Sequence, residues 1–360
     1  MISPLGKVPL VAAGLLLPLF ALFSAAGDAP RARAAFWPVP APPQTNPDAQ
    51  ETEQPLPVFE FHSGFWINLH HFLYTLAQDQ NDAPAADLLT GAKLTPEEQR
   101  KWQAAVNYYA ESYANLDPAV NSDLINLKNQ LGAGENCAEI SAHGGLRCNL
   151  NLPKELTRVL ESAAGVYRTH WWNQQDQANR RWTVQAAPMV RQWGKELSEE
   201  LSRIYQERWP AERIRVDVTA YATRAGAYTT LDPLRVTIAS LDPRNQGQAA
   251  LEVLFREASH GLAESVQTAI ARQCRIRDKP IPRNLWHAIV FYTAGAVVKD
   301  VLRNRTDRGK SSTYTPDTVS EGLNARRWLG YLQLIEKYWK PYLQGKADFN
   351  DAIAGMVSAL

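Results

Sequence analysis

The sequence predicts an α+β fold that is predominantly α-helical. Hydrophobic residues recur at helical spacing through most of 58–209, which indicates helices that each bury one face. The spacing changes at 213–222 (RIRVDVTAYA) to an alternation of apolar and polar residues, which is typical of a half-buried strand. Because 45% of the 360 residues are hydrophobic, the chain can bury a core in one large or two modest domains.

The N-terminus has the pattern of a secretory signal peptide at 1–26. A segment with one lysine precedes the uncharged apolar run 8–23 (VPLVAAGLLLPLFALF), and small residues at 24–26 follow it. A retained membrane anchor is the alternative, but a spanning helix needs about 20 apolar residues, and this shorter run contains Pro18. We therefore expect an exported protein, periplasmic or extracellular, with no integral membrane segment after the signal is cleaved.

Residues 27–57 are expected to form a disordered spacer. They carry eight prolines among small and polar residues, and they show no apolar periodicity. Folded structure is expected from Val58 onward, with an N-terminal helical part at 58–212 and a second part at 213–360. We expect these two parts to form one compact unit.

The N-terminal part is predicted to contain several helices. Thr95 and Glu98 (T-P-E-E) form a capping box with a proline at the first helical position, so a helix is expected from there to about Ala114. Further helices are expected at 65–77, from Pro153 onward, and at 169–209 as two helices interrupted near Pro188.

The second part is predicted to begin with a small antiparallel sheet. Its three short strands are expected at 213–222, 227–230 and 234–240. A long helix at 248–271 follows, and helices at 284–303 and 321–344 come after it.

Residues 255–260 (FREASH) carry most of a metal-binding motif. In zinc peptidases, H-E-x-x-H places two histidines on one helix face beside a glutamate that acts as general base. Glu257 and His260 stand at the glutamate and second-histidine positions, but Arg256 stands at the first, and a guanidinium has no lone pair for a metal. At 100° per residue these side chains share one helix face, which Glu264 continues one turn later.

A solvated helix face with an incidental ion pair is the simpler interpretation, because Glu-x-x-His alone is a weak signal. The flanking residues favour a metal-site helix instead. The preceding residues 251–255 are apolar except for Glu252, small residues stand at 258 and 261, and a predicted strand comes just before the helix. On such a buried helix, charged residues are rare unless they are paired.

The segment 213–303 resembles the gluzincin-type zinc metallopeptidases. It is more similar still to a group of uncharacterised exported bacterial proteins with F-H-E-A-S-H, followed by a helix reading W-H-A-x-x-F-Y-T-x-G-E. Here these stretches read FREASH at 255–260 and WHAIVFYTAGA at 286–296. The resemblance implies a zincin-like fold with Glu257 as general base and His260 as zinc ligand, and it places Ala296 where the third ligand, a glutamate, belongs.

One remaining ligand does not hold zinc, since structural sites use four protein ligands and catalytic sites use three. We therefore expect no cofactor and a protein that has lost peptidase activity but keeps the cleft for binding or scaffolding, with a peptide or protein as partner. The Arg256 guanidinium is expected to replace the charge of the metal by pairing with Glu257 or Glu264. The net charge of +1 points neither to nucleic acid nor to an anionic membrane surface.

Two other functions remain open. With zinc as cofactor, the chain is an active metallopeptidase if His287 and Glu264 join His260 as replacement ligands, although Arg256 then sets a fixed positive charge beside the metal. It is a structural helical envelope protein if Glu257 and His260 do not face a cleft.

The three cysteines allow one disulfide. Cys137 and Cys148 flank a short loop with two glycines, so a small disulfide ring is one expectation and three free thiols are the other. In the first case Cys274 is left unpaired.

Export is directly testable. Because the apolar run ends at small residues, the mature protein should begin after Ala26 or a few residues later. N-terminal sequencing of the protein recovered from its native compartment measures this. A membrane-bound product that still begins at Met1 would show that the apolar run is a retained anchor.

Overall fold

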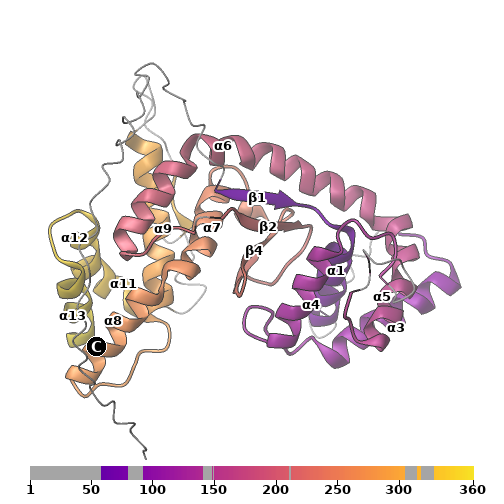
Figure 1. Ribbon diagram of the computed structural model, residues 1–360, viewed down its shortest axis with the longest axis horizontal. Helices are drawn as coiled ribbons and strands as arrows, with labels where there is room; N and C mark the ends of the chain where they lie inside the picture. The colour runs from indigo at the N-terminus through magenta and orange to yellow at the C-terminus, as the bar shows by residue number, and fades with distance from the viewer. Residues whose placement is uncertain are drawn as a thin grey trace, which may run out of the picture. The chain divides into compact units, whose positions relative to one another are not determined.

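The computed structural model describes residues 58–79, 92–140, 148, 150–210, 212–304, 314–317 and 328–360. The expected signal peptide (1–26) and spacer (27–57) lie outside the described residues. From Gln54 to Leu360 the chain forms one compact unit. Its described part is mostly helical around one small sheet, so the α+β class is confirmed (Figure 1).

The sheet has four strands in the order β1-β2-β4-β3. They are β1 (Phe59–His62), β2 (Ile214–Thr219), β3 (Ala227–Leu231) and β4 (Leu234–Ala239). The expectation of an antiparallel sheet is wrong, because β1 pairs parallel with β2, β2 pairs parallel with β4, and only β3 and β4 are antiparallel. The parallel β2–β4 pairing was missed because the β3–β4 hairpin returns β4 to the side of β2. Strand β1 was missed because its four residues are too few to show an alternation.

The two faces of the sheet have opposite character. Val216, Val218 and Ile238 lie on the apolar face, in a core that also contains residues of the helices Asn173–Tyr205 (α6) and Ala249–Ala258 (α7). The alternate residues, including Asp217 and Thr237, form the polar face, and both of these are fully buried. The alternation of apolar and polar residues in β2 was predicted correctly. The strand was expected to be half-buried, however, and both of its faces are buried, one in the apolar core and the other in a polar layer.

Helices α1 (Phe65–Asp79) and α4 (Ser122–Ala133) cover the polar face. The ammonium of Lys128 in α4 donates a 2.7 Å hydrogen bond to the Thr230 hydroxyl, and the Asn68 side-chain oxygen in α1 accepts one of 3.0 Å from the Ala220 amide. Beyond this polar layer lies a second hydrophobic core, made by α1, α4 and the helices α3 (Pro96–Ser112) and α5 (Lys154–Tyr167).

Several predicted helix boundaries are confirmed. The 65–77 helix is α1, the helix after Pro153 is α5, and α9 (Leu285–Asn304) matches the 284–303 prediction. At α3, the Thr95 hydroxyl accepts the Glu98 amide and the Glu98 carboxylate accepts the Thr95 amide, so the capping box is formed. The helices α4 and α13 (Phe349–Ser358) were not predicted.

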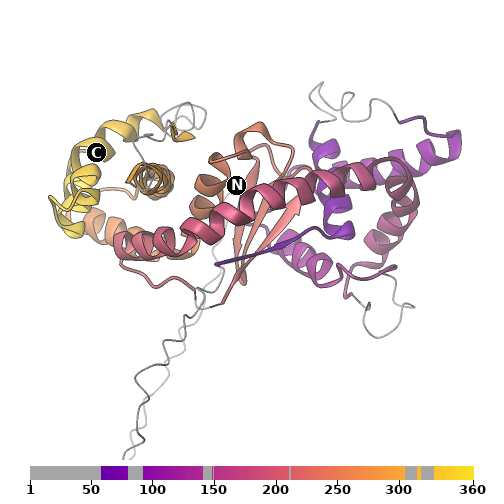
Figure 2. The same ribbon diagram turned by 90° about the horizontal axis from the view of Figure 1, so that it is seen from above.

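The prediction of two helices across 169–209 is wrong. A short π-helix at Arg168–Trp172 leads into α6, a single helix of 33 residues with Pro188 inside it. Ala186, Val190 and Leu197 of α6 are buried in the core, so packing on both sides of the proline offsets the backbone hydrogen bond that the proline removes. Figure 2 shows α6 passing over the strands.

The predicted 248–271 helix is broken. Helix α7 ends at Ala258, a 3₁₀ turn spans Ser259–Leu262, and α8 (Glu264–Ile276) begins after it. The Ser259 hydroxyl donates a 2.7 Å hydrogen bond to the Phe255 carbonyl, which competes with helix continuation. At Gly261 the backbone passes so close to Leu234 that a Cβ there would lie 2.8 Å from its side chain.

The C-terminal segment is only partly as predicted. Of the expected 321–344 helix, residues 321–327 lie outside the described part. The remainder forms α11 (Leu329–Leu334), a π-helix at Ile335–Trp339 and α12 (Lys340–Leu343).

In the described part of the chain, α9 is long and apolar enough to cross a membrane, but 67% of its most apolar 18-residue stretch is buried inside the protein. It packs against α6 and α7, as the core helix of a globular unit does.

The cysteine alternatives are resolved. Cys137 and Cys148 form a disulfide with their Cα atoms 5.4 Å apart, and Cys274 is a free, buried thiol. The bond ties the segment after α4 to the segment that leads into α5.

The buried Lys128 gives a pH-dependent prediction. Burial lowers the pKa of Lys128 from its ordinary value of 10.5 to about 8, although the nearby Asp217 charge acts to raise it. Below pH 8 the lysine is protonated in both folded and unfolded states, and the folded state bears the cost of desolvation. As pH rises from 8 to 10.5, Lys128 loses its proton in the folded state before it does so in the unfolded state. The free energy of unfolding should therefore rise by roughly 3 kcal/mol over this range.

Urea unfolding of the wild type and of Lys128→Met at pH 7, 8.5 and 10 isolates this effect, because the variant lacks the titrating group. The stability difference between the two proteins should change with pH in favour of the wild type. Lys101→Met, at an exposed lysine paired with Glu97, is the control and should give a nearly constant difference. A constant difference for Lys128→Met would mean that Lys128 is solvated.

Candidate functional site

Arg256 and Glu257 lie in the last turn of α7 and are both buried, with 4% and 5% of their surface exposed. The Arg256 Nη2 atom is 3.2 Å from Glu257 Oε1, and the guanidinium carbon lies 4.5 Å from the centre of the Phe291 ring of α9. On its other side, Arg256 Nη1 is 3.7 Å from Asp317 Oδ2. The guanidinium therefore sits between two carboxylates and against an aromatic face, which stabilises a cation.

Glu257 is held as a carboxylate. The Thr229 hydroxyl of β3 lies 2.9 Å from Glu257 Oε2 and 2.8 Å from the Glu257 carbonyl oxygen. Burial acts to raise the pKa of Glu257, but the charges of His260 and Arg256 and the Thr229 hydrogen bond outweigh it, so the net effect lowers the pKa. The Glu257 carboxylate, at the general-base position of the motif, thus interacts with Arg256, Thr229 and His260.

His260 lies in the 3₁₀ turn after α7 and is the most solvent-accessible of the three motif residues, with 21% of its side chain exposed. Its Nδ1 atom is 3.1 Å from the Glu257 carbonyl oxygen and 3.7 Å from Glu257 Oε2. Glu257 and His260 are therefore brought together as the motif predicts.

His287 also reaches this site. Its ring centre lies 5.5 Å from that of His260. The His287 ring stacks on Trp286 at 3.5 Å, and its plane is within 10° of that of Trp328, 5.8 Å away. The imidazole of His287 is thus part of an aromatic stack.

Asp317, Tyr314 and Glu252 belong to the site but were not predicted. Glu252 is fully buried in α7, and its carboxylate accepts hydrogen bonds from the Tyr314 hydroxyl and, at 3.1 Å, from the Asp317 amide. Burial raises the pKa of Glu252 despite these hydrogen bonds. Its position four residues before Arg256 on one helix face could have identified it, whereas no local pattern marks Tyr314 or Asp317.

Glu264 and Ala296 are not brought to this site. Glu264 is exposed in the first turn of α8, and its carboxylate makes no ion pair or hydrogen bond with another described residue. Ala296 lines a cavity between α6 and α9 together with Glu196 and Glu200. At 100° per residue it lies about 180° around α9 from His287.

The side chains around Arg256 do not fit a zinc ion. Across the described residues, no group of three or more His, Cys, Asp or Glu side chains is placed to hold a metal. Zinc needs three or four such ligands, and the fixed charge of Arg256 would repel it.

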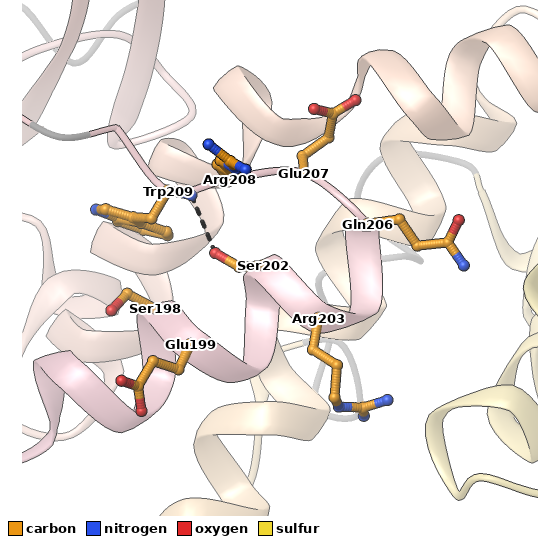
Figure 3. A pocket seen from close by; sticks show the side chains of 8 residues that line it. All are labelled: Ser198, Glu199, Ser202, Arg203, Gln206, Glu207, Arg208 and Trp209. Carbon is orange, nitrogen blue, oxygen red and sulfur yellow. Dashed lines mark hydrogen bonds between the residues drawn. The ribbon is translucent and has the colours of Figure 1, made fainter. Parts of the chain in front are cut away.

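A separate cavity of about 500 Å³ lies at the C-terminal end of α6 (Figure 3). Its lining residues are Ser198, Glu199, Ser202, Arg203 and 206–209. The Ser202 hydroxyl there accepts the Trp209 amide at 3.1 Å, and none of the predicted site residues lines it.

No protein-family model, curated protein or solved structure matches this chain.

The ion pairs of Arg256 predict a large effect of its removal. Arg256→Ala should destabilise the fold by about 3–5 kcal/mol, because it leaves buried Glu257 without its cation. Glu264→Ala, at the exposed carboxylate, is the matched control and should change stability by less than about 0.5 kcal/mol. Urea unfolding of both variants measures this, and equal midpoints for Arg256→Ala and the wild type would place Arg256 in solvent.

Proposed function

We propose that this protein is an exported, zincin-like protein with a degenerate metal site, and that it acts by binding a peptide or protein rather than by cleaving one. One observation carries the proposal. The buried Arg256 guanidinium lies between the Glu257 and Asp317 carboxylates, 3.2 Å and 3.7 Å away, at the position where the motif has its first zinc ligand.

A cation at this position supports the loss of the metal site because it performs the electrostatic task of a metal. Without zinc, Glu257 would be a buried carboxylate with no counter-charge, and burial of an uncompensated charge is costly. Arg256 supplies that charge with forked donors and requires no ion. The same charge makes later acquisition of zinc unfavourable.

The surroundings of His260 support a binding role. His260 is partly exposed and lies beside the half-buried rings of Trp286 and His287. An accessible imidazole beside aromatic faces offers a hydrogen bond and flat apolar contacts to a peptide. Glu257, which a peptidase needs as a free base, is instead occupied by Arg256 and Thr229.

An active metallopeptidase is the second candidate, and the 5.5 Å between the His260 and His287 ring centres favours it. Two imidazoles at this separation are near enough to share one ion. A catalytic zinc site needs a third protein ligand, however, and Arg256 stands beside the only carboxylate of the motif.

Zinc content and peptide hydrolysis test the proposal. The purified protein should hold well under one zinc per chain after dialysis and should not cleave peptides. Elemental analysis measures the first quantity. Stoichiometric zinc and peptide hydrolysis in the wild type, both lost in His287→Ala, would establish the metallopeptidase alternative.

Restoring the missing ligand tests the zincin-like geometry. Arg256→His replaces the guanidinium by an imidazole beside His260 and His287, so added zinc should raise its melting temperature but not that of the wild type. In the double variant Arg256→His/His287→Ala, added zinc should raise the melting temperature by less. No response of Arg256→His to zinc would mean that these side chains do not descend from a zinc site.

A further inference from the structure

The 275–283 turn, which comprises the last two residues of α8 and the chain that follows towards α9, exposes two isoleucines. Ile276 and Ile281 have 69% and 64% of their surface exposed, although they lie only five residues apart. Val120, in the turn before α4, and Val184, in α6, are somewhat more exposed, but each stands alone. Single exposed apolar residues need no explanation, whereas a pair of isoleucines in one turn does.

The same turn is strongly basic. Between Arg272 and Arg283 there are five cationic residues and one acidic residue, Asp278, which gives 5 − 1 = +4 over twelve residues. The whole chain carries only +1. The turn is therefore a local cationic surface in a nearly neutral chain. The net charge of +1 led us to expect no anionic membrane surface as partner, and that expectation does not apply to this turn.

The turn is fixed in shape. The Lys279 amide donates a 2.9 Å hydrogen bond to the Cys274 carbonyl, and Asp278 adopts a left-handed φ of 51°. The Lys279 ammonium bonds the Val357 and Ser358 carbonyls at the end of α13, near which the turn lies (Figure 1). The two isoleucines are thus presented on an anchored backbone, which lowers the entropy cost of docking.

Two cations of the turn are left for a partner. Arg275 and Arg283 are exposed, and neither guanidinium group forms an ion pair or hydrogen bond with any residue that the structure describes. They flank Ile276 and Ile281 in the sequence. Exposed guanidinium groups beside exposed aliphatic side chains match a surface that is anionic outside and apolar just below.

We propose that the 275–283 turn is a docking surface for an anionic lipid membrane. The arginines bind lipid phosphates, and Ile276 and Ile281 insert at the boundary between head groups and acyl chains. A single-stranded nucleic acid would use aromatic side chains for base stacking, and residues 272–283 contain none. A nucleic acid held by phosphate contacts alone would give no role to the exposed Ile276 and Ile281. The 275–283 turn contains none of the residues that contact Arg256, and the proposal does not depend on the function of that site.

Co-sedimentation with vesicles tests the proposal. The purified protein should bind vesicles with 30% phosphatidylglycerol in phosphatidylcholine more tightly than pure phosphatidylcholine vesicles. Arg275→Glu/Arg283→Glu should weaken binding by at least about fivefold per arginine. Ile276→Ser/Ile281→Ser should weaken it by roughly tenfold. If residues 1–26 remain attached, the comparison still holds because every variant carries them.

The matched control is Arg181→Glu/Val184→Ser on α6, which changes one exposed arginine and one exposed valine and should bind as the wild type does. Circular dichroism melting checks that all variants are folded. Equal binding of wild type and both turn variants would overturn the proposal. Loss with the arginine variant but not with the isoleucine variant would also overturn it, because the turn would then bind polyanions such as heparin by charge alone.

Discussion

The need to neutralise one buried guanidinium organises the centre of this protein. Three parts of the chain that contact Arg256 supply negative charge or an aromatic face. Helix α7 supplies Glu257, the 314–317 segment supplies Asp317, and α9 supplies the ring of Phe291. Strand β3 then holds Glu257 through Thr229. Four parts of the chain that are far apart in sequence therefore meet at one charge.

The break in the helix leaves its motif residues together. The 3₁₀ turn after Ala258 changes the direction of the chain, yet His260 Nδ1 stays 3.1 Å from the Glu257 carbonyl oxygen. Glu264 was expected to continue the same helix face one turn after His260. It lies beyond the break, on α8, and its side chain is exposed. The motif is therefore a feature of α7 and its turn and not of a longer helix.

Local signals in the sequence predicted the local parts of the structure. The Thr95 capping box, the three strands after 213 and the neighbouring positions of Glu257 and His260 all depend on residues within a few positions of one another. The parallel pairing of β1 with β2 joins residues about 155 positions apart, and Asp317 reaches Arg256 across 61 positions. No spacing rule covers such distances, so these features required the folded structure.

The polar layer under α1 and α4 has an evolutionary consequence. Lys128 and Asp217 are both buried there, and they come from a helix and a strand that meet only in the folded protein. Asp217 also pairs with Arg215, whose Nε atom lies 2.7 Å from its carboxylate, so it keeps a cation when Lys128 is lost. Loss of Asp217 instead removes the nearby negative charge that acts to raise the pKa of Lys128 and leaves the Arg215 Nε atom without this partner, so substitutions at Asp217 are selected against more strongly than substitutions at Lys128. Descendants of this chain should therefore lose the charge at position 128 before the charge at position 217, while the apolar face of the same strand varies among Val, Ile and Leu.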